Sequence, residues 1–209
     1  MSSVPRAAAG PGAEADAGPV LADVAAVGPF FELPVLRAWA EGEVSPFSGP
    51  AADPVALRAR IRQVRDALGS DERVAASITF QGLAARLVSA PLAAVALHRV
   101  APDLSGIARR PGAQDPWAPV LPAPGPRPVG VHTSDPADDP DGAAGVLASM
   151  LLDRLLAPLV TAVRGLVPVS AHVLWGNVAS ALAGSGRVLD RARPAARPAV
   201  LGLLGALLD

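Results

Sequence analysis

The residues best suited to bind a ligand lie in two apolar stretches of this chain, Gln81 and Arg86 in the first and Trp175 and Asn177 in the second. A side-chain amide or guanidinium in an apolar setting needs hydrogen-bond partners, and an arginine can hold an anion through two parallel hydrogen bonds. These four are therefore our candidate ligand-binding residues. A structural role competes at each: a hydrogen-bond network for Gln81 and Arg86, core packing for Trp175, and a link between helices for Asn177.

Other kinds of catalytic or metal chemistry have weaker support in the sequence. The chain has no cysteine, which excludes disulfides, thiolate metal sites and cysteine nucleophiles within it. His98 and His172 are isolated imidazoles, without a histidine or carboxylate at ligand spacing, and we expect both to be structural. The aspartates between positions 135 and 141 lack the spacing and the closing glutamate of an EF-hand, so they predict turns and a helix cap.

Hydrophobic periodicity predicts that helices position all four candidates. The expected helices cover residues 20–27, 54–68, 71–89, 91–100, 143–164, 168–187 and 200–208. Pro158 should kink the fifth of these or begin a second helix. The stretch 168–187 combines a bulky apolar stripe with a stripe of almost no side-chain volume, which would let another helix approach closely. The bulky stripe is Leu174, Trp175, Val178, Ala181 and Leu182, and the small one is Gly176, Ala179, Ser180, Ala183 and Gly186.

Length and composition favour one domain, since 209 residues with 51% apolar content can build a sizeable core. Residues 1–19 are rich in Ala, Gly and Pro without a periodic pattern, so we expect a disordered tail there. A single domain should then span residues 20–209, with a proline-rich insertion at 101–140. Two short runs in the insertion, 117–121 and 128–133, are compatible with a loose edge β-hairpin. The predicted fold is mainly α, a multi-helix bundle carrying this insertion.

Charge and hydropathy bear on partners and location. The formal net charge is −1, so nothing indicates broad attraction to nucleic acid. Arg58, Arg62 and Arg65 share one helix face, which we expect to be solvated. No secretory signal is visible, and no run of about 18 uncharged apolar residues exists. We therefore expect a cytoplasmic protein without a transmembrane segment, and leave contact with a membrane surface open.

Several segments, taken in order, resemble one known family. The run Leu174-Trp175-Gly176-Asn177, followed by Val-Ala-Ser-Ala-Leu, is similar to the signature helix of bacterial ferric-siderophore reductases. Residues 24–31 resemble the family's N-terminal helix and its exit, and residues 73–87 resemble its central helix. The stretches 91–102, which holds His98, and 156–164 complete the series. Together they span roughly residues 20–197.

The resemblance implies a role in iron acquisition, in which a helical body binds a ferric siderophore and a [2Fe-2S] cluster reduces Fe(III) by one electron. In the family a cysteine-rich C-terminal segment holds that cluster, whereas this chain has no cysteine. We therefore expect no cofactor in this chain and no reductase activity for residues 1–209 alone. A truncated product and a relative without the cluster are both compatible with this. A ferric siderophore is the expected ligand, and the electron donor is unspecified. The alternatives are a non-enzymatic helical interaction module and an inactive fragment.

Overall fold

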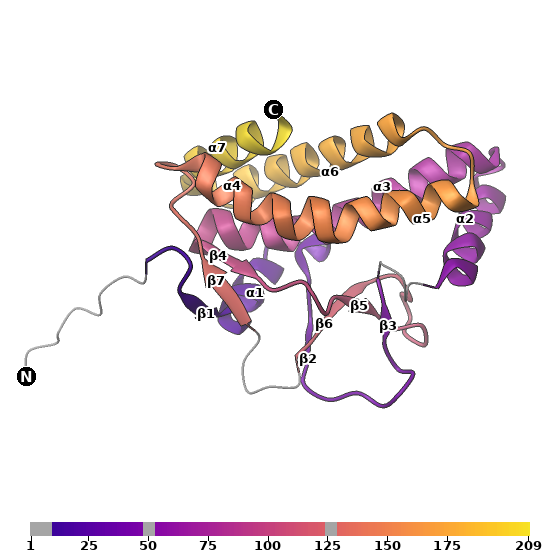
Figure 1. Ribbon diagram of the computed structural model, residues 1–209, viewed down its shortest axis with the longest axis horizontal. Coiled ribbons are helices and arrows are strands. Elements are labelled where there is room, and N and C mark those ends of the chain that lie inside the picture. The colour runs from indigo at the N-terminus through magenta and orange to yellow at the C-terminus, as the bar shows by residue number, and fades with distance from the viewer. Residues whose placement is uncertain (1–9, 48–52, 124–128) are drawn as a thin grey trace, which may run out of the picture.

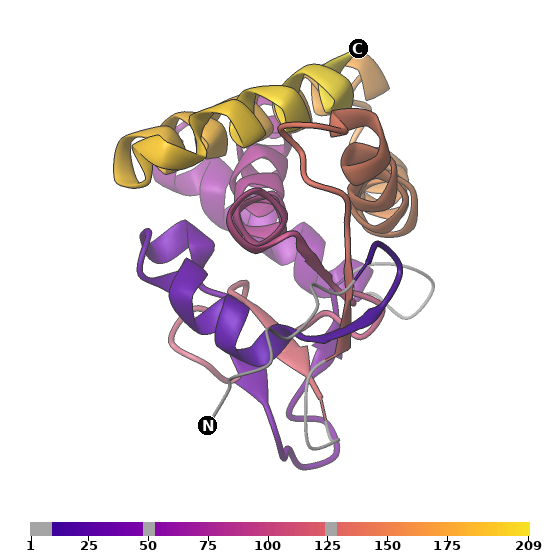
Figure 2. The same ribbon diagram turned by 90° about the vertical axis from the view of Figure 1, so that its left-hand side faces the viewer.

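The computed structural model describes residues 10–47, 53–123 and 129–209, and its fold is mainly α (Figure 1). Helices of the C-terminal half cover one side of the long helix α3, while α1 and two small sheets lie on its other side (Figures 1 and 2). The helices are α1 (Ala17–Ala25), α2 (Pro54–Leu68), α3 (Glu72–His98), α4 (Pro140–Ala148), α5 (Ala157–Leu166), α6 (Ala171–Ala192) and α7 (Arg197–Leu208). Shorter turns are the 3-10 segments η1 (Pro29–Phe31) and η3 (Pro194–Ala196) and the π-helical segment η2 (Ser149–Leu156).

Helix α3 is central because it is apolar on most sides. It contacts α1, α2, α4, α5, α6 and α7, and every residue from position 87 to 96 is buried. The sequence predicted a break before Pro91, but α3 runs through this proline without ending. A proline in a helix interior costs roughly 3 kcal/mol. Burial of all ten residues from 87 to 96 offsets that cost, and local periodicity did not reveal this burial.

The starts of α2 and α3 follow from their capping residues. Asp53 accepts hydrogen bonds from the backbone N–H of Val55 and Ala56 at 2.9 and 3.0 Å. Asp71 caps α3 in the same way, and Gly69 ends α2 at a φ of 60°, where glycine has no steric penalty. The expected end of the first helix at residue 68 is therefore confirmed, whereas the second helix begins at Glu72, with Asp71 rather than Ser70 as its cap.

Helices α4 and α5 form one rod that contains a wider π-helical turn, η2. Pro158 lies in the first turn of α5, directly after η2. A proline clashes with the carbonyl four residues before it, and a wider turn relieves that clash. The sequence predicted a kink or a new helix at this proline, and the structure has a π-helical segment directly before it, after which α5 begins.

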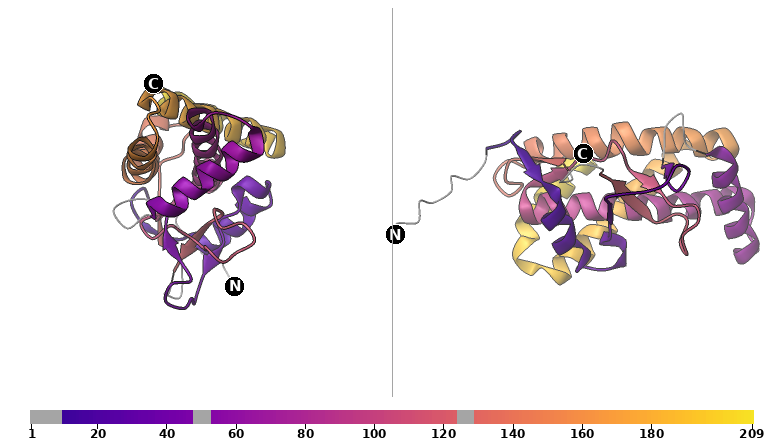
Figure 3. Two further views of the ribbon diagram at one scale, coloured as in Figure 1. Left: turned by 90° about the vertical axis from the view of Figure 1, so that its right-hand side faces the viewer. Right: turned by 90° about the horizontal axis from the view of Figure 1, so that it is seen from below.

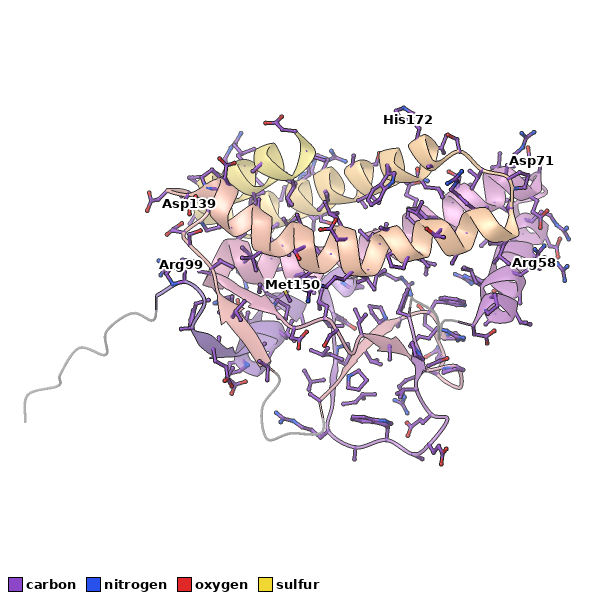
Figure 4. The ribbon with its side chains drawn as sticks, in the orientation of Figure 1. Arg58, Asp71, Arg99, Asp139, Met150 and His172 are labelled. Atoms are coloured by element: carbon purple, nitrogen blue, oxygen red, sulfur yellow. The ribbon has the colours of Figure 1, made fainter. Side chains whose placement is uncertain are left out.

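The end of α5 is held by Arg58, which lies with Asp71 at the same end of the molecule (Figure 4). Its Nη2 donates a hydrogen bond to the Leu166 carbonyl at 3.0 Å, and its Nη1 lies 3.7 Å from a carboxylate oxygen of Glu72. The expectation of a solvated basic face is therefore wrong at Arg58, which caps the C-terminus of another helix. The helical spacing of Arg58 could not reveal its partner Leu166, which lies 108 residues away in the sequence.

Two small sheets replace the predicted hairpin. One has the order β1-β7-β4 and the other β2-β6-β5-β3, so the runs expected to pair, now β6 and β7, lie in different sheets. Alternating apolar residues indicate a strand but not its partner, and β6 pairs with the nearby β5 while β7 pairs with β4. The strands are β1 (Glu14–Asp16), β2 (Val35–Leu36), β3 (Ser45–Pro46), β4 (Val100–Pro102), β5 (Ala108–Arg109), β6 (Pro119–Pro122) and β7 (Val129–His132).

The N-terminal part is more regular than its composition predicted. Residues 1–9 of the expected tail lie outside the described residues, but Glu14–Asp16 forms β1, which pairs antiparallel with β7. Asp16 then caps α1 by accepting a hydrogen bond from the Gly18 N–H at 2.9 Å. A view from below shows β1, α1 and the other strands lying across the helical body (Figure 3).

Candidate functional site

The four predicted ligand residues do not converge on one site. Successive helix residues are about 100° apart, so Trp175 and Asn177 are separated by roughly 200° around α6. Gln81 and Arg86 are about 140° apart around α3. A single pocket cannot collect all four side chains.

Gln81 and Trp175 are more exposed than the sequence indicated. Gln81 faces solvent rather than an internal hydrogen-bond network, because the first half of α3 is covered on one side only. Trp175 is 37% exposed, although its neighbours Leu174 and Val178 are buried. The buried arc of α6 is narrow in its first turns, so the broad apolar stripe expected there is interrupted at Trp175.

Asn177 links two helices. Its Nδ2 donates hydrogen bonds to the Ser77 carbonyl and to the Ser77 Oγ, at 3.0 and 2.9 Å. These hydrogen bonds correspond to the structural alternative for Asn177, a link between helices. The amide is half-buried and both of its N–H donors have acceptors on α3, so its amide nitrogen is not free for a ligand.

A second polar contact between α3 and α6 was not predicted. The Oγ atoms of Ser89 and Ser185 lie 2.7 Å apart and are buried. Each hydroxyl also lies within hydrogen-bond distance of the carbonyl four residues earlier, at 2.6 and 2.8 Å. Because Ser77 and Ser89 of α3 meet Asn177 and Ser185 of α6 in the same order, the two helices run in the same direction.

Of the four candidates, Arg86 lines a pocket formed by η1, the segment that follows it and residues 115–120. Its Nη1 forms a hydrogen-bonded ion pair with the Asp115 carboxylate, and its Cζ lies 5.9 Å from the centre of the Phe30 ring. The pocket has a volume of about 260 Å³. Its lining residues are Pro29, Phe30, Glu32, Pro34, Arg86, Asp115, Ala118, Pro119 and Val120.

The charge of Asp115 is stabilised by its neighbours. Burial alone would raise the pKa of this carboxyl, but the hydrogen bond from Arg86, the backbone N–H of Trp117 and the charges of Arg86 and Arg60 together lower the pKa below its ordinary value. Asp115 is therefore a carboxylate at neutral pH, and the pocket presents a paired guanidinium and carboxylate beside an apolar ring.

A cluster of aromatic and charged side chains lies next to Asp115. The Trp117 N–H donates to the Asp115 Oδ1 at 3.1 Å, and the buried Trp117 ring contacts Phe47 edge to face. The Arg109 guanidinium lies 4.5 Å from the centre of the same ring and 3.4 Å from the Asp53 Oδ2. Burial lowers the pKa of Arg109, and the charge of Asp53 opposes that shift. No local sequence pattern indicates this cluster, because its members lie on four separate segments.

The residues present do not fit the iron–sulfur cluster of the resembled family. Such a cluster takes four thiolate ligands, and the chain has no cysteine. Within the described ranges no group of three or more His, Asp or Glu side chains is placed to hold a metal ion. His98 lies 3.0 Å from Asp23, and His172 points outward from the start of α6 (Figure 4).

Two helical stretches, Glu72–His98 and Pro140–Leu166, are long and apolar enough to cross a membrane by length and composition. The most apolar window of the first is 72% buried inside the protein, as in the core helix of a folded domain, whereas that of the second is 39% buried. Comparison of the chain with models of known protein families, with curated proteins and with solved structures gives no match.

Proposed function

We propose that this chain is a ferric-siderophore reductase-like protein of iron acquisition that binds a ferric siderophore and carries no electron itself. The observation that supports binding is the placement of Arg86, half-buried at a pocket beside the exposed ring of Phe30. Only its Nη1 has a hydrogen-bond acceptor within the described part of the chain, so the other guanidinium N–H groups can meet a ligand.

The chemistry of the pocket suits an oxygen-rich chelate. A guanidinium donates charge-assisted hydrogen bonds to anionic oxygens, and the Phe30 ring offers apolar contact. The volume of about 260 Å³ is below the 300–1,000 Å³ typical of complete small-molecule sites. The pocket would therefore hold one chelating arm, with the rest of the ligand over the adjacent surface.

Calorimetric titration with a hydroxamate siderophore, in its ferric and iron-free forms, tests this proposal. We expect saturable binding of the ferric form and at least tenfold weaker binding in Arg86→Gln. Arg73→Gln is the matched control, since Arg73 is an exposed arginine of the same helix and has no ion pair with the residues that the structure describes. Asp115→Asn should preserve or strengthen binding, because it releases Arg86 from its partner.

Other results would reject the siderophore site. Absence of saturable binding by the native chain would do so, as would equal losses in the Arg86 and Asp115 variants, since equal losses indicate a structural ion pair. Thermal melting of each variant checks that the protein is folded. Iron and acid-labile sulfide assays address the electron-transfer part: we expect no stoichiometric cluster, and finding one would refute that part.

A helical interaction module is the second candidate, and exposed aliphatic side chains favour it. Val74 and Ile78 lie one turn apart on α3, and Val173 lies one turn before Asn177 on α6; each is 44% exposed. The Asn177–Ser77 hydrogen bonds bring these parts of the two helices together. Light scattering of native protein and Ile78→Asp would detect self-association, the simplest form of such a module. An inactive fragment would show neither this nor siderophore binding.

The proposal places the protein in the cytoplasm, without a transmembrane segment. The burial of most of α3 inside the domain supports this placement for the first of the two long apolar helices. Fractionation of cells into soluble and membrane pools is the direct test, and recovery only from the detergent extract would contradict it.

A further inference from the structure

We propose that a second pocket, between α1 and residues 32–37, binds an organic cation with an apolar body, such as a primary alkylamine. This pocket is next to the proposed siderophore site, with which it shares Glu32 and Pro34, but Arg86 does not line it. The pocket has a volume of about 720 Å³, within the range of small-molecule sites.

The walls of this pocket are apolar. One wall is the face of α1 that carries Leu21, Ala22 and Ala25, and the opposite wall is the extended segment through Leu33 and Val35. The alanines leave space between the walls because their side chains are short. An alkyl chain of several carbons would bury its surface there at roughly 25 cal/mol per Å².

The charged groups at this pocket favour a cation over an anion. Asp16 and Glu32 line it with one arginine, Arg37, so carboxylates outnumber guanidinium groups. The Glu32 carboxylate has no hydrogen bond or ion pair among the described residues, and it borders both this pocket and the Arg86 pocket. A primary ammonium has three N–H donors and forms charge-assisted hydrogen bonds with carboxylates.

The surrounding segment adds to this preference. Residues 10–47 contain six carboxylates and one arginine; the carboxylates are Glu14, Asp16, Asp23, Glu32, Glu41 and Glu43. Asp16, Asp23 and Glu43 interact with other groups of the protein, which reduces their contribution. The remaining negative charge attracts cations over about 10 Å at moderate salt.

Calorimetric titration with octylammonium chloride tests the proposal, with octanoate and octanol as probes of the same chain length. We expect saturable binding of octylammonium, weaker binding of octanol and no binding of octanoate. Ala22→Phe should reduce octylammonium affinity at least tenfold, because Ala22 is exposed and the added ring would occupy the pocket. Glu32→Gln should reduce it about fivefold, the upper end for an exposed charge pair.

Glu41→Gln is the matched control, since it removes one exposed carboxylate from the same segment without touching the pocket. It should leave the affinity unchanged. Octanoate binding as tightly as octylammonium, an unchanged affinity in Ala22→Phe, or an equal loss in the Glu41 and Glu32 variants would each overturn the proposal. Absence of saturable octylammonium binding would overturn it directly. Circular dichroism confirms that Ala22→Phe is folded.

Discussion

Two glycines of α6 allow a direct test of how closely α6 and α7 pack. A Cβ at Gly186 would lie 2.5 Å from the Leu204 Cδ1 and 3.3 Å from the Val200 Cγ1, both on α7. A Cβ at Gly176 would meet no atom within 4 Å. Both glycines occupy the same helix, so Gly→Ala at either position gains the same helix propensity of roughly 1 kcal/mol.

The two substitutions should therefore change the free energy of unfolding by different amounts. Gly176→Ala should stabilise the protein by about 1 kcal/mol. Gly186→Ala gains the same helix propensity but must displace the Leu204 side chain, and such overpacking costs about 1–3 kcal/mol. The net effect at Gly186 should lie between neutrality and a loss of about 2 kcal/mol. Leu204 is half-buried, so its side chain can move and the lower end of the overpacking range is the better estimate.

Urea denaturation of both variants and the native chain measures the difference. Thermal melting provides a second measurement, since 1 kcal/mol shifts the midpoint by about 2–4 °C in a chain of this size. A third variant, Gly186→Ala with Leu204→Ala, should show a favourable coupling energy, because removing the Leu204 branch relieves the clash. If Gly186→Ala stabilised the protein as much as Gly176→Ala, the close approach of α6 and α7 would be refuted.

Three further predictions concern polar contacts. Asn177→Ala should lower the free energy of unfolding, measured by urea denaturation, by about 1–3 kcal/mol, since two hydrogen bonds to α3 are lost. Ser180→Ala changes an exposed residue of the same helix and should cost far less in the same assay. The pKa of Asp115 is lowered in the folded protein. Its contribution to stability is therefore present above its unfolded pKa and is lost as the pH falls through its folded pKa. Asp115→Asn should show a shallower loss of thermal stability between about pH 5 and 3 than the native chain. Arg58→Ala should cost about 1 kcal/mol because the Leu166 carbonyl loses its donor; amide exchange should quicken in the last turn of α5, and unchanged exchange there would contradict the capping role.

The helices could be predicted from local signals. Asp53 begins α2, as expected, by accepting hydrogen bonds from the N–H groups two and three positions later. Asp71 and Ser170 begin α3 and α6 in the same way, one and three residues after the starts expected from the sequence. Such contacts are readable from sequence because both partners lie in the same short window. The π-helical turn before Pro158 belongs to the same class of local effect.

Features that depend on distant partners could not be predicted. Burial decides whether Pro91 ends α3, and the elements that bury it come from both ends of the chain. The Arg86–Asp115 pair joins a helix to a loop 29 residues away, and the sequence identified Arg86 without its partner. The sequence placed Trp175 in the buried stripe of α6, whereas it is exposed, because the width of that stripe depends on which neighbours cover α6. Periodicity indicates an apolar side but not how much of it another element reaches.

The two oxygens of Asp53 connect helix α2 with one of the two sheets. One oxygen caps α2, and the other lies beside the buried guanidinium of Arg109 in the sheet β2-β6-β5-β3. Opening either part alone would leave a helix end without its acceptor or a buried cation without its countercharge, and both are costly. The first turn of α2 and this sheet should therefore fluctuate as one cooperative unit, although few residues join them.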